Sequence, residues 1–201
     1  MKLLSKAFFV GALGLMAAAS QAQGIIFGGW YPISVNYVTN PGFESLMSDW
    51  NGSNSYFEGD ELMFESLCSA TMDPHSGHYG LDMYQGDAYG YNGFYHAEVI
   101  QTLTTPVAVS SLWQGSVWCQ SGGNILNMVV TYTDNTATYA SFSVDSQNAA
   151  PGNNGYVQWN FLPLLNQSKT IKAIDFSTNS FDGTNIEIDD VSLSTLVWIY
   201  I

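Results

Sequence analysis

The run LWQGSVWCQSGGNILNMVVTYT, at residues 112–133, decides the fold class of this chain. Its first part alternates the apolar Val117 and Cys119 with the polar Ser116 and Gln120, and a period of two is typical of a β-strand. A turn containing two glycines interrupts the pattern, and a second alternating run follows. The stretch therefore predicts two β-strands joined by a turn. Its expected inner face holds Trp113, Val117, Cys119, Leu126, Met128, Val130 and Tyr132.

Similar runs follow one another along most of the chain, with almost no helical periodicity. They are rich in Val, Ile, Thr, Tyr, Phe and Trp, and clusters of Gly, Asn, Ser and Asp separate them. We therefore expect an all-β fold, an antiparallel β-sandwich of jelly-roll type with about ten strands. The apolar tail 196–201 is either a last strand or an edge that needs a partner. The expected strands are residues 33–39, 61–67, 79–84, 95–104, 112–120, 125–133, 138–145, 156–162, 170–177 and 186–194.

Residues 1–22 have the features of a secretory signal peptide. Two lysines precede an apolar run at residues 7–19, and residues 20–22 are of the kind that a signal peptidase reads. We expect cleavage before Gln23, a single domain over residues 23–201, and a location that is extracellular, periplasmic or at the cell surface. The apolar run is shorter than the roughly 20 residues that span a bilayer, so no membrane insertion is expected. A short amphipathic anchor is the alternative.

The chain contains two cysteines, Cys68 and Cys119, which would meet an oxidising compartment after export. A bridge between them would stabilise the fold by roughly 4 kcal/mol in the chain-entropy model. The sequence does not place the two sulfur atoms together, so two separate buried thiols remain the alternative.

The charge balance narrows the choice of partners. The chain carries 17 acidic and 4 basic residues, and beyond the leader only Lys169 and Lys172 are basic. Nucleic acid is not an expected partner, because phosphate binding needs clustered Lys and Arg, and docking on anionic lipid is disfavoured for the same reason. Acidic polysaccharides would be repelled, so we expect uncharged partners or cations.

The side chains expected on the outer faces of the strands are amides, hydroxyls and rings rather than charges. Amides donate and accept hydrogen bonds toward sugar hydroxyls, and flat rings cover the apolar face of a sugar ring. This composition predicts recognition of a neutral glycan. A face that is polar only for solubility, or that a neighbouring subunit covers, is the alternative. The candidate ligand-binding residues are Trp118, Tyr139, Tyr156, Gln158, Asn160, Gln120 and Gln114.

A segment rich in glycine and aromatic residues, residues 85–96, adds two candidates. Glycine gives the backbone freedom and the rings give contact area, so Tyr89 and Tyr91 are expected to bind ligand if this segment is a loop over the sheet. A loop whose tyrosines pack on the sandwich is the alternative.

Four motifs occur in order along the chain: TNPGFE at residues 39–44 followed by Trp50, HSGHYGL at 75–81, VIQTL at 99–103, and IEIDDVSL at 186–193. Together they resemble the carbohydrate-binding-module jelly rolls of the galactose-binding-like superfamily, of the family 4/9/22 type. The resemblance covers residues 40–193 and implies a jelly-roll fold with sugar binding. Similar architecture also occurs in secreted bacterial surface proteins, so the resemblance is more specific for the fold than for the ligand.

The last of these motifs also predicts a metal site. Its apolar positions slip by one between its two halves, which indicates a bulge at Asp189-Asp190. Such a bulge would direct a carboxylate to the sheet edge, where Glu44 could face it. Hard oxygen ligands suit Ca²⁺ rather than zinc. The resemblance implies the same structural calcium, held by Glu44 and Asp189 with carbonyls near Asn40 and Ser76. Solvated strand ends are the alternative.

No catalytic constellation stands out, so we expect no enzyme activity. A G-x-S-x-G elbow is absent, and His75-x-x-His78 supplies only two ligands of a zinc site. With 17 acidic residues, some pair at glycosidase spacing always exists. The expected function is non-catalytic, calcium-stabilised glycan binding outside the cell. The alternative is a structural or adhesive protein of the cell surface or extracellular matrix, which would self-associate through its polar faces and residues 197–201.

Overall fold

The computed structural model describes residues 29–56, 66–71, 73–85, 95–180 and 184–200 of the chain. They divide into two compact units, one within residues 34–197 and a small one formed by residues 29–33 and 198–200. The helical turns of the described chain, η1 (Val109–Ser111), η2 (Ser146–Asn148) and η3 (Leu162–Leu164), are each three residues long, and none could cross a membrane. The strands of the described chain are β1 (Trp30–Asn36), β2 (Asn51–Tyr56), β3 (Ser66–Thr71), β4 (Gly80–Gln85), β5 (Tyr95–Ala108), β6 (Leu112–Gln120), β7 (Gly122–Tyr132), β8 (Ala137–Asp145), β9 (Val157–Asn160), β10 (Thr170–Ser180) and β11 (Thr184–Tyr200).

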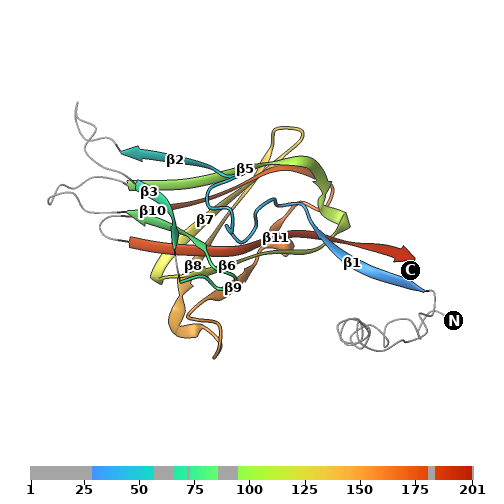
Figure 1. The fold of residues 1–201 in the computed structure, drawn as a ribbon. Coiled ribbons are helices and arrows are strands. Elements are labelled where there is room, and N and C mark those ends of the chain that lie inside the picture. Colours follow the sequence, from blue (N-terminus) through green and yellow to red (C-terminus); the bar gives the residue numbers. More distant parts are fainter. Residues whose placement is uncertain (1–28, 57–65, 72, 86–94, 181–183, 201) are drawn as a thin grey trace, which may run out of the picture. The chain divides into compact units, whose positions relative to one another are not determined.

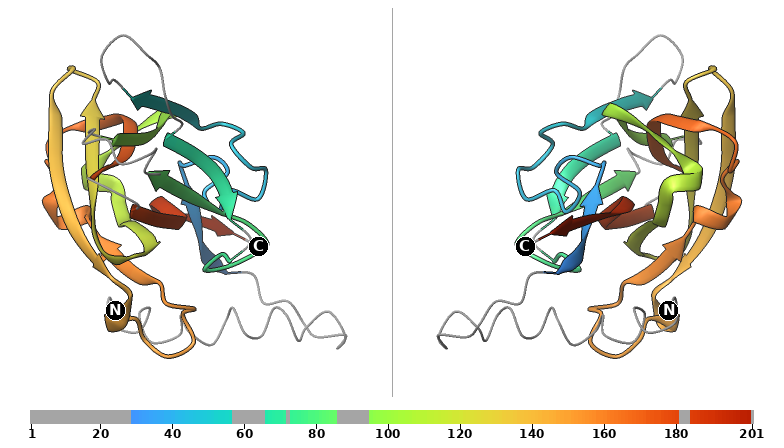
Figure 2. Two further views of the ribbon diagram at one scale, coloured as in Figure 1. Left: turned by 90° about the vertical axis from the view of Figure 1, so that its left-hand side faces the viewer. Right: turned by 90° about the vertical axis from the view of Figure 1, so that its right-hand side faces the viewer.

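The strands form the two sheets of a β-sandwich (Figure 1). The six-stranded sheet has the order β3-β4-β11-β6-β9, with β1 also paired to β11, and the five-stranded sheet has the order β2-β5-β10-β7-β8. The paired strands with a defined register run antiparallel. Figure 2 shows β7 and β8, in yellow, on the opposite side from β3 and β4, in green. The predicted all-β antiparallel sandwich of jelly-roll type is confirmed.

The alternation of side chains separates the core from the surface, as the period of two requires. Trp113 is the exception, because it is half exposed and its expected inward placement is wrong. The β6–β11 ladder shifts opposite this residue, between Ser194 and Thr195. The regular alternation of β6 therefore does not extend to the first residues of the strand. β6 and β7 do not pair with each other, because they belong to different sheets. The other residues expected on their inner faces are buried: Val117, Cys119, Leu126, Met128, Val130 and Tyr132.

Cys119 is a free thiol in this core. Burial raises its pKa to about 12, so the thiolate is scarce at neutral pH. Because Cys119 is free, the bridge to Cys68 considered from the sequence is not formed. The side chain of Cys68 lies outside the described part of the chain.

β2 lies on an edge of the five-stranded sheet, paired with β5, and was not expected from the sequence. Its residues, NGSNSY, contain no alternating apolar positions and several turn-forming residues, so local propensity gives no signal for it. The expected strand at residues 61–67 falls mostly outside the described residues, and β3 begins at Ser66.

β11 contains the predicted bulge. Its ladder with β6 shifts between Asp189 and Ser192, and Asp190 has a positive φ of 46°. Val191 then donates its backbone N–H to the carbonyl oxygen of Pro41 rather than continuing the ladder. The bulge therefore turns both aspartate side chains toward the same outer face of the six-stranded sheet.

A buried amide fixes the segment that carries Glu44. Gln101, on β5, accepts a hydrogen bond from the backbone N–H of Thr39 at 2.9 Å. Its Nε2 donates to the carbonyl oxygens of Thr39 and Asp49, at 2.9 and 3.2 Å. One side chain thus ties both ends of the 39–49 segment to the sandwich, and the segment carries Glu44 between them.

Candidate functional site

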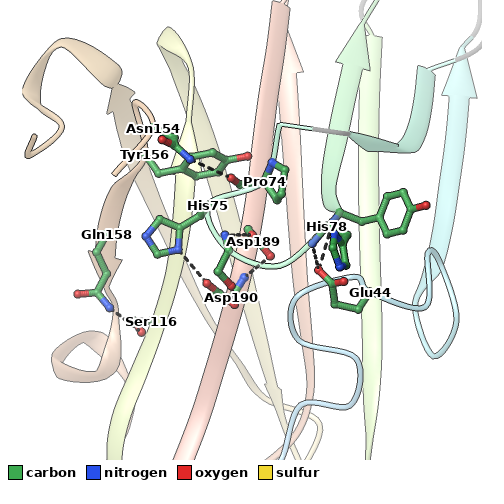
Figure 3. Close-up of polar contacts among 12 residues, drawn as sticks. Glu44, Pro74, His75, His78, Ser116, Asn154, Tyr156, Gln158, Asp189 and Asp190 are labelled. Carbon is green, nitrogen blue, oxygen red and sulfur yellow. Dashed lines mark hydrogen bonds and ion pairs between the residues drawn. The ribbon is translucent and has the colours of Figure 1, made fainter. Parts of the chain in front are cut away.

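Three carboxylates hold the loop between β3 and β4 against the outer face of the six-stranded sheet (Figure 3). Asp189 Oδ2 accepts the backbone N–H of Ser76 at 3.0 Å, and Asp190 Oδ1 accepts the Ser76 hydroxyl at 3.0 Å. Glu44 Oε1 accepts the backbone N–H groups of His78 and Tyr79, at 2.8 and 3.1 Å. The two terminal motifs of the sequence therefore meet through this loop.

The electrostatics of these carboxylates differ because their surroundings differ. The hydrogen bonds from the backbone of His78 and Tyr79 lower the pKa of Glu44. Burial, together with the charge of Asp190, raises the pKa of Asp189 to about 7, against the opposing effect of the Ser76 N–H. Glu44 is thus a solvated anchor, while Asp189 is a buried acid held by backbone donors.

The anchored loop places His75 against Trp118. The two rings are stacked, with centroids 3.9 Å apart and planes 13° apart. His75 Nδ1 donates to Asp190 Oδ2 at 2.8 Å, which fixes the orientation of the imidazole. His75 also meets the ring of Tyr156 edge-on, with 5.7 Å between centroids. The indole is therefore supported on one face by a side chain that is itself held in place.

A pocket of about 440 Å³ opens beside Trp118, where the edge strands β8 and β9 of the two sheets approach each other. η2 and the loop between η2 and β9 close its sides. Asp145 is fixed there, because it accepts hydrogen bonds from the backbone N–H of Gln147 and from Asn148 Nδ2, both at 3.0 Å. No lysine belongs to the described lining. The lining includes Trp118, Phe142, Asp145, Asn148, Asn153 and Gln158.

The structure brings together some of the ligand-binding residues expected from the sequence. Trp118 and Gln158 are register partners on β6 and β9, and both line the pocket. Asn160, Gln114 and Gln120 lie on the same outer face but are not part of the lining. Tyr89 and Tyr91 lie outside the described residues.

Two expectations about tyrosines are corrected by the structure. Tyr156 was expected on an exposed face but is fully buried, because its hydroxyl reaches the Asp73 carbonyl oxygen and Glu187 Oε2 beneath the loop. Only its inclusion in the pocket wall links it to the site. Tyr139 is exposed, yet it belongs to β8 of the other sheet and does not line the pocket. It therefore does not share a surface with Trp118.

Sequence reasoning missed the far wall of the pocket. Phe142, Asp145, Asn148 and Asn153 line this wall, and none of them was expected to bind ligand. A partial signal existed, because Asp145 followed by Gln147 and Asn148 has the composition of a capped turn. The closeness of this turn to Trp118 depends on the approach of two edge strands, which no local pattern reports.

The residues expected to hold calcium make hydrogen bonds of their own in the structure. The Asn40 carbonyl oxygen already accepts two hydrogen bonds, from the backbone N–H of Phe43 and from Trp50 Nε1. Ser76 turns its N–H and hydroxyl, both donors, toward Asp189 and Asp190. The carboxylates of Glu44, Asp189 and Asp190 thus accept hydrogen bonds, and the calcium site expected from the sequence stays a prediction. His75 with Asp189 and Asp190 forms a compact donor group, but His75 already donates within it.

Comparisons with known proteins support the fold only. No family model matches this sequence, and no curated protein matches it. Among solved structures, the enzymatically active domain of tailspike protein 4 of bacteriophage CBA120 aligns with a TM-score of 0.51 and 14% identity, over 81% of this chain and 21% of that chain. This chain therefore spans about a fifth of that protein and shares its sandwich fold there.

Two carbohydrate-binding modules of Clostridium thermocellum align more weakly, over more than nine tenths of their length. The family 11 module of the cellulase Lic26A-Cel5E has a TM-score of 0.39 and 11% identity, over 88% of this chain and 91% of that chain. The C-terminal family 22 module of Xyn10B has a TM-score of 0.44 and 13% identity, over 80% of this chain and 94% of that chain.

Proposed function

We propose that this chain is a secreted, non-catalytic protein that binds a neutral glycan in the pocket beside Trp118. The observation that carries the proposal is one cavity of about 440 Å³ that combines an indole ring with amide groups and a fixed carboxylate. Small-ligand sites are concave, largely apolar and equipped with a few placed polar groups. A sugar needs both kinds of contact, because each ring has apolar C–H faces and a rim of hydroxyls.

The support of Trp118 by His75 determines how a sugar would meet the indole. One face of the indole is covered by the imidazole at 3.9 Å, so a ligand contacts the opposite face or the edge. Because Asp190 holds His75, the indole needs little ordering when the ligand binds. The sugar hydroxyls would then form hydrogen bonds with the amides of the pocket walls, Asn148, Asn153 and Gln158.

The charge of the pocket supports a neutral ligand. Asp145 is part of its lining, and the whole chain carries a net charge of −13. An acidic sugar would meet this carboxylate without a cationic partner in the described lining. Neutral polysaccharides avoid that repulsion.

Affinity electrophoresis in gels that contain neutral polysaccharides tests the proposal. Trp118→Ala is expected to abolish the retardation shown by the wild-type chain. Trp113→Ala is the matched control, because Trp113 is on the same strand, is half exposed and does not line the pocket. Unchanged retardation of Trp118→Ala, or equal loss in both variants, would reject this site.

Export rests on residues 1–22 and is tested separately. If the leader directs secretion, the protein recovered from the medium or periplasm begins at Gln23 by intact mass. A full-length chain that stays with the cytoplasmic fraction contradicts the proposal.

A second candidate function is self-association through the small unit formed by residues 29–33 and 198–200. Trp30, Trp198 and Tyr200 expose 65%, 50% and 66% of their surface, and large exposed rings of this kind mark contact sites. Light scattering after size-exclusion chromatography tests it with the variant Tyr200→Ser. A wild-type chain that is monomeric at every concentration excludes this function.

A further inference from the structure

A row of oxygen-bearing side chains crosses the outer face of the six-stranded sheet near the pocket. Glu187, on β11, is the register partner of Asp82 on β4 and of Gln120 on β6. Directly opposed residues point to the same face with Cβ atoms about 5 Å apart. Asp82, Glu187 and Gln120 are therefore adjacent on one surface, with Glu187 in the middle.

Two buried oxygen atoms of this row have no hydrogen-bond partner among the described residues. They are Asp82 Oδ1 and Gln120 Oε1. Both are acceptors, and they flank Glu187 from opposite sides. Buried acceptors of this kind are rare in folded proteins, because the lost contact with water is not replaced.

The surrounding groups supply too few donors for these acceptors. The Tyr156 hydroxyl has one hydrogen, yet Glu187 Oε2 and the Asp73 carbonyl oxygen both lie within reach, at 2.9 and 3.0 Å. Thr71 contributes one further hydrogen bond to Glu187. The cluster therefore contains more acceptors than hydrogens to satisfy them.

The described basic side chains do not neutralise this row. Lys169 pairs with Asp134 and Lys172 donates to Asn135, both at the turn between β7 and β8 of the other sheet. The remaining basic residues of the chain are the two lysines of the leader.

We propose that Asp82, Glu187 and Gln120 bind a hard divalent cation, for which Ca²⁺ is the probe. Carboxylate and amide oxygens are the ligands that Ca²⁺ prefers, and the Asp73 carbonyl oxygen lies beside the same cluster. This ion would join β4, β11 and β6 and would also fix Glu187, the partner of Tyr156 in the pocket wall. The site is separate from Glu44 and Asp189, whose oxygens are already occupied by hydrogen-bond donors.

Calcium chloride added to the purified, chelator-treated chain tests the site, by isothermal calorimetry and by thermal unfolding. Wild type is expected to bind the ion and to melt at a higher temperature, because a ligand that binds only the native state stabilises it. Asp82→Asn removes a charge at constant size, so its calcium affinity is expected to fall by roughly tenfold or more. Its melting temperature in chelator should equal or exceed that of wild type, because the repulsion by Glu187 is removed.

Two further variants keep the test decisive. Gln120→Met retains the side-chain length without the amide oxygen and is expected to weaken calcium binding even if Asp82→Asn folds poorly. Glu44→Gln is the matched control and should keep the full calcium response. The proposal is overturned if calcium leaves wild type unchanged, or if Asp82→Asn and Gln120→Met respond like wild type. It is equally overturned if Glu44→Gln alone loses the response.

Discussion

The imidazole of His75 lies nearly parallel to the indole of Trp118, with 3.9 Å between the ring centroids. Asp190, a residue of the β11 bulge, holds the imidazole through Nδ1. A distortion in one strand is thus connected through a loop to the ring that forms a wall of the pocket. The relationship makes His75 a positioning residue rather than a ligand contact.

His75→Ala should weaken glycan binding without unfolding the chain. An aromatic pair contributes about 0.5–1.5 kcal/mol beyond burial, so the affinity should fall by roughly two- to tenfold. Affinity electrophoresis at several polysaccharide concentrations measures the change. His78→Ala is the control, because His78 meets the carboxylate anchor through its backbone N–H. Equal affinities of His75→Ala and wild type would show that the stack does not position Trp118.

Gly77→Ala should destabilise the chain more than any other glycine substitution in the described turns. Gly77 has a φ of 71°, and a Cβ there would lie 2.0 Å from Glu44 Oε1. The new methyl group would displace Glu44 from both backbone N–H groups. Gly152→Ala isolates the backbone effect, because Gly152 has a φ of 92° in open space. That control should lose about 1–2 kcal/mol in urea unfolding. If both variants unfold at the same urea concentration, the Glu44 anchor contributes nothing to stability.

The pair Asp175 and Glu98 should lower the free energy of unfolding as the pH rises toward alkaline values. They are hydrogen bonded to each other on β10 and β5, and burial together with this bond raises the pKa of Asp175 from 3.8 to about 8. A carboxyl group whose pKa is higher in the folded than in the unfolded state stabilises the fold at low pH, and this contribution is lost as the pH rises. The free energy of unfolding of wild type should therefore fall between about pH 4 and pH 8 through this group.

Asp175→Asn should remove this dependence, because the amide keeps a hydrogen bond to Glu98 without a second charge. The variant is expected to unfold at a higher urea concentration than wild type at pH 9, with a smaller difference at pH 4. Parallel pH profiles for the two proteins would show that the pair does not share a proton.

Cys119 should resist modification in the native protein. Its thiol is buried and its pKa is raised to about 12, so both access and thiolate population are low. In the variant Cys68→Ser, iodoacetamide is expected to add to Cys119 only after unfolding in urea, as measured by intact mass. Rapid labelling of the folded variant would contradict the described burial.

Much of the fold could be predicted, because hydrophobic alternation reports which face of a strand is buried. β6 has the same bounds in prediction and structure, and the phase slip in β11 located the bulge at Asp189-Asp190. β2 could not be predicted, because its sequence has no apolar face and its place in the sheet depends on pairing with the distant strand β5. The inward placement of Trp113 was wrong for a related reason, because the register of β6 against β11 shifts at this residue.

The candidate site was only partly predictable. Trp118 and Gln158 were identified because they alternate with core residues on adjacent strands. Tyr156 has the same alternation, yet the β3–β4 loop covers it, and the sequence contains no signal for where that loop lies. The opposite wall depends on two edge strands that belong to different sheets.

The bulge in β11 has a consequence for engineering the protein. The alternation of side chains shifts by one residue at Asp189-Asp190, so odd and even positions exchange faces of the sheet midway along this strand. If a regular strand replaced this segment, its side chains would face the correct side of the sheet in one half and the wrong side in the other half. Deleting a single residue there would bring both halves into one frame and turn the carboxylates away from the loop that they hold.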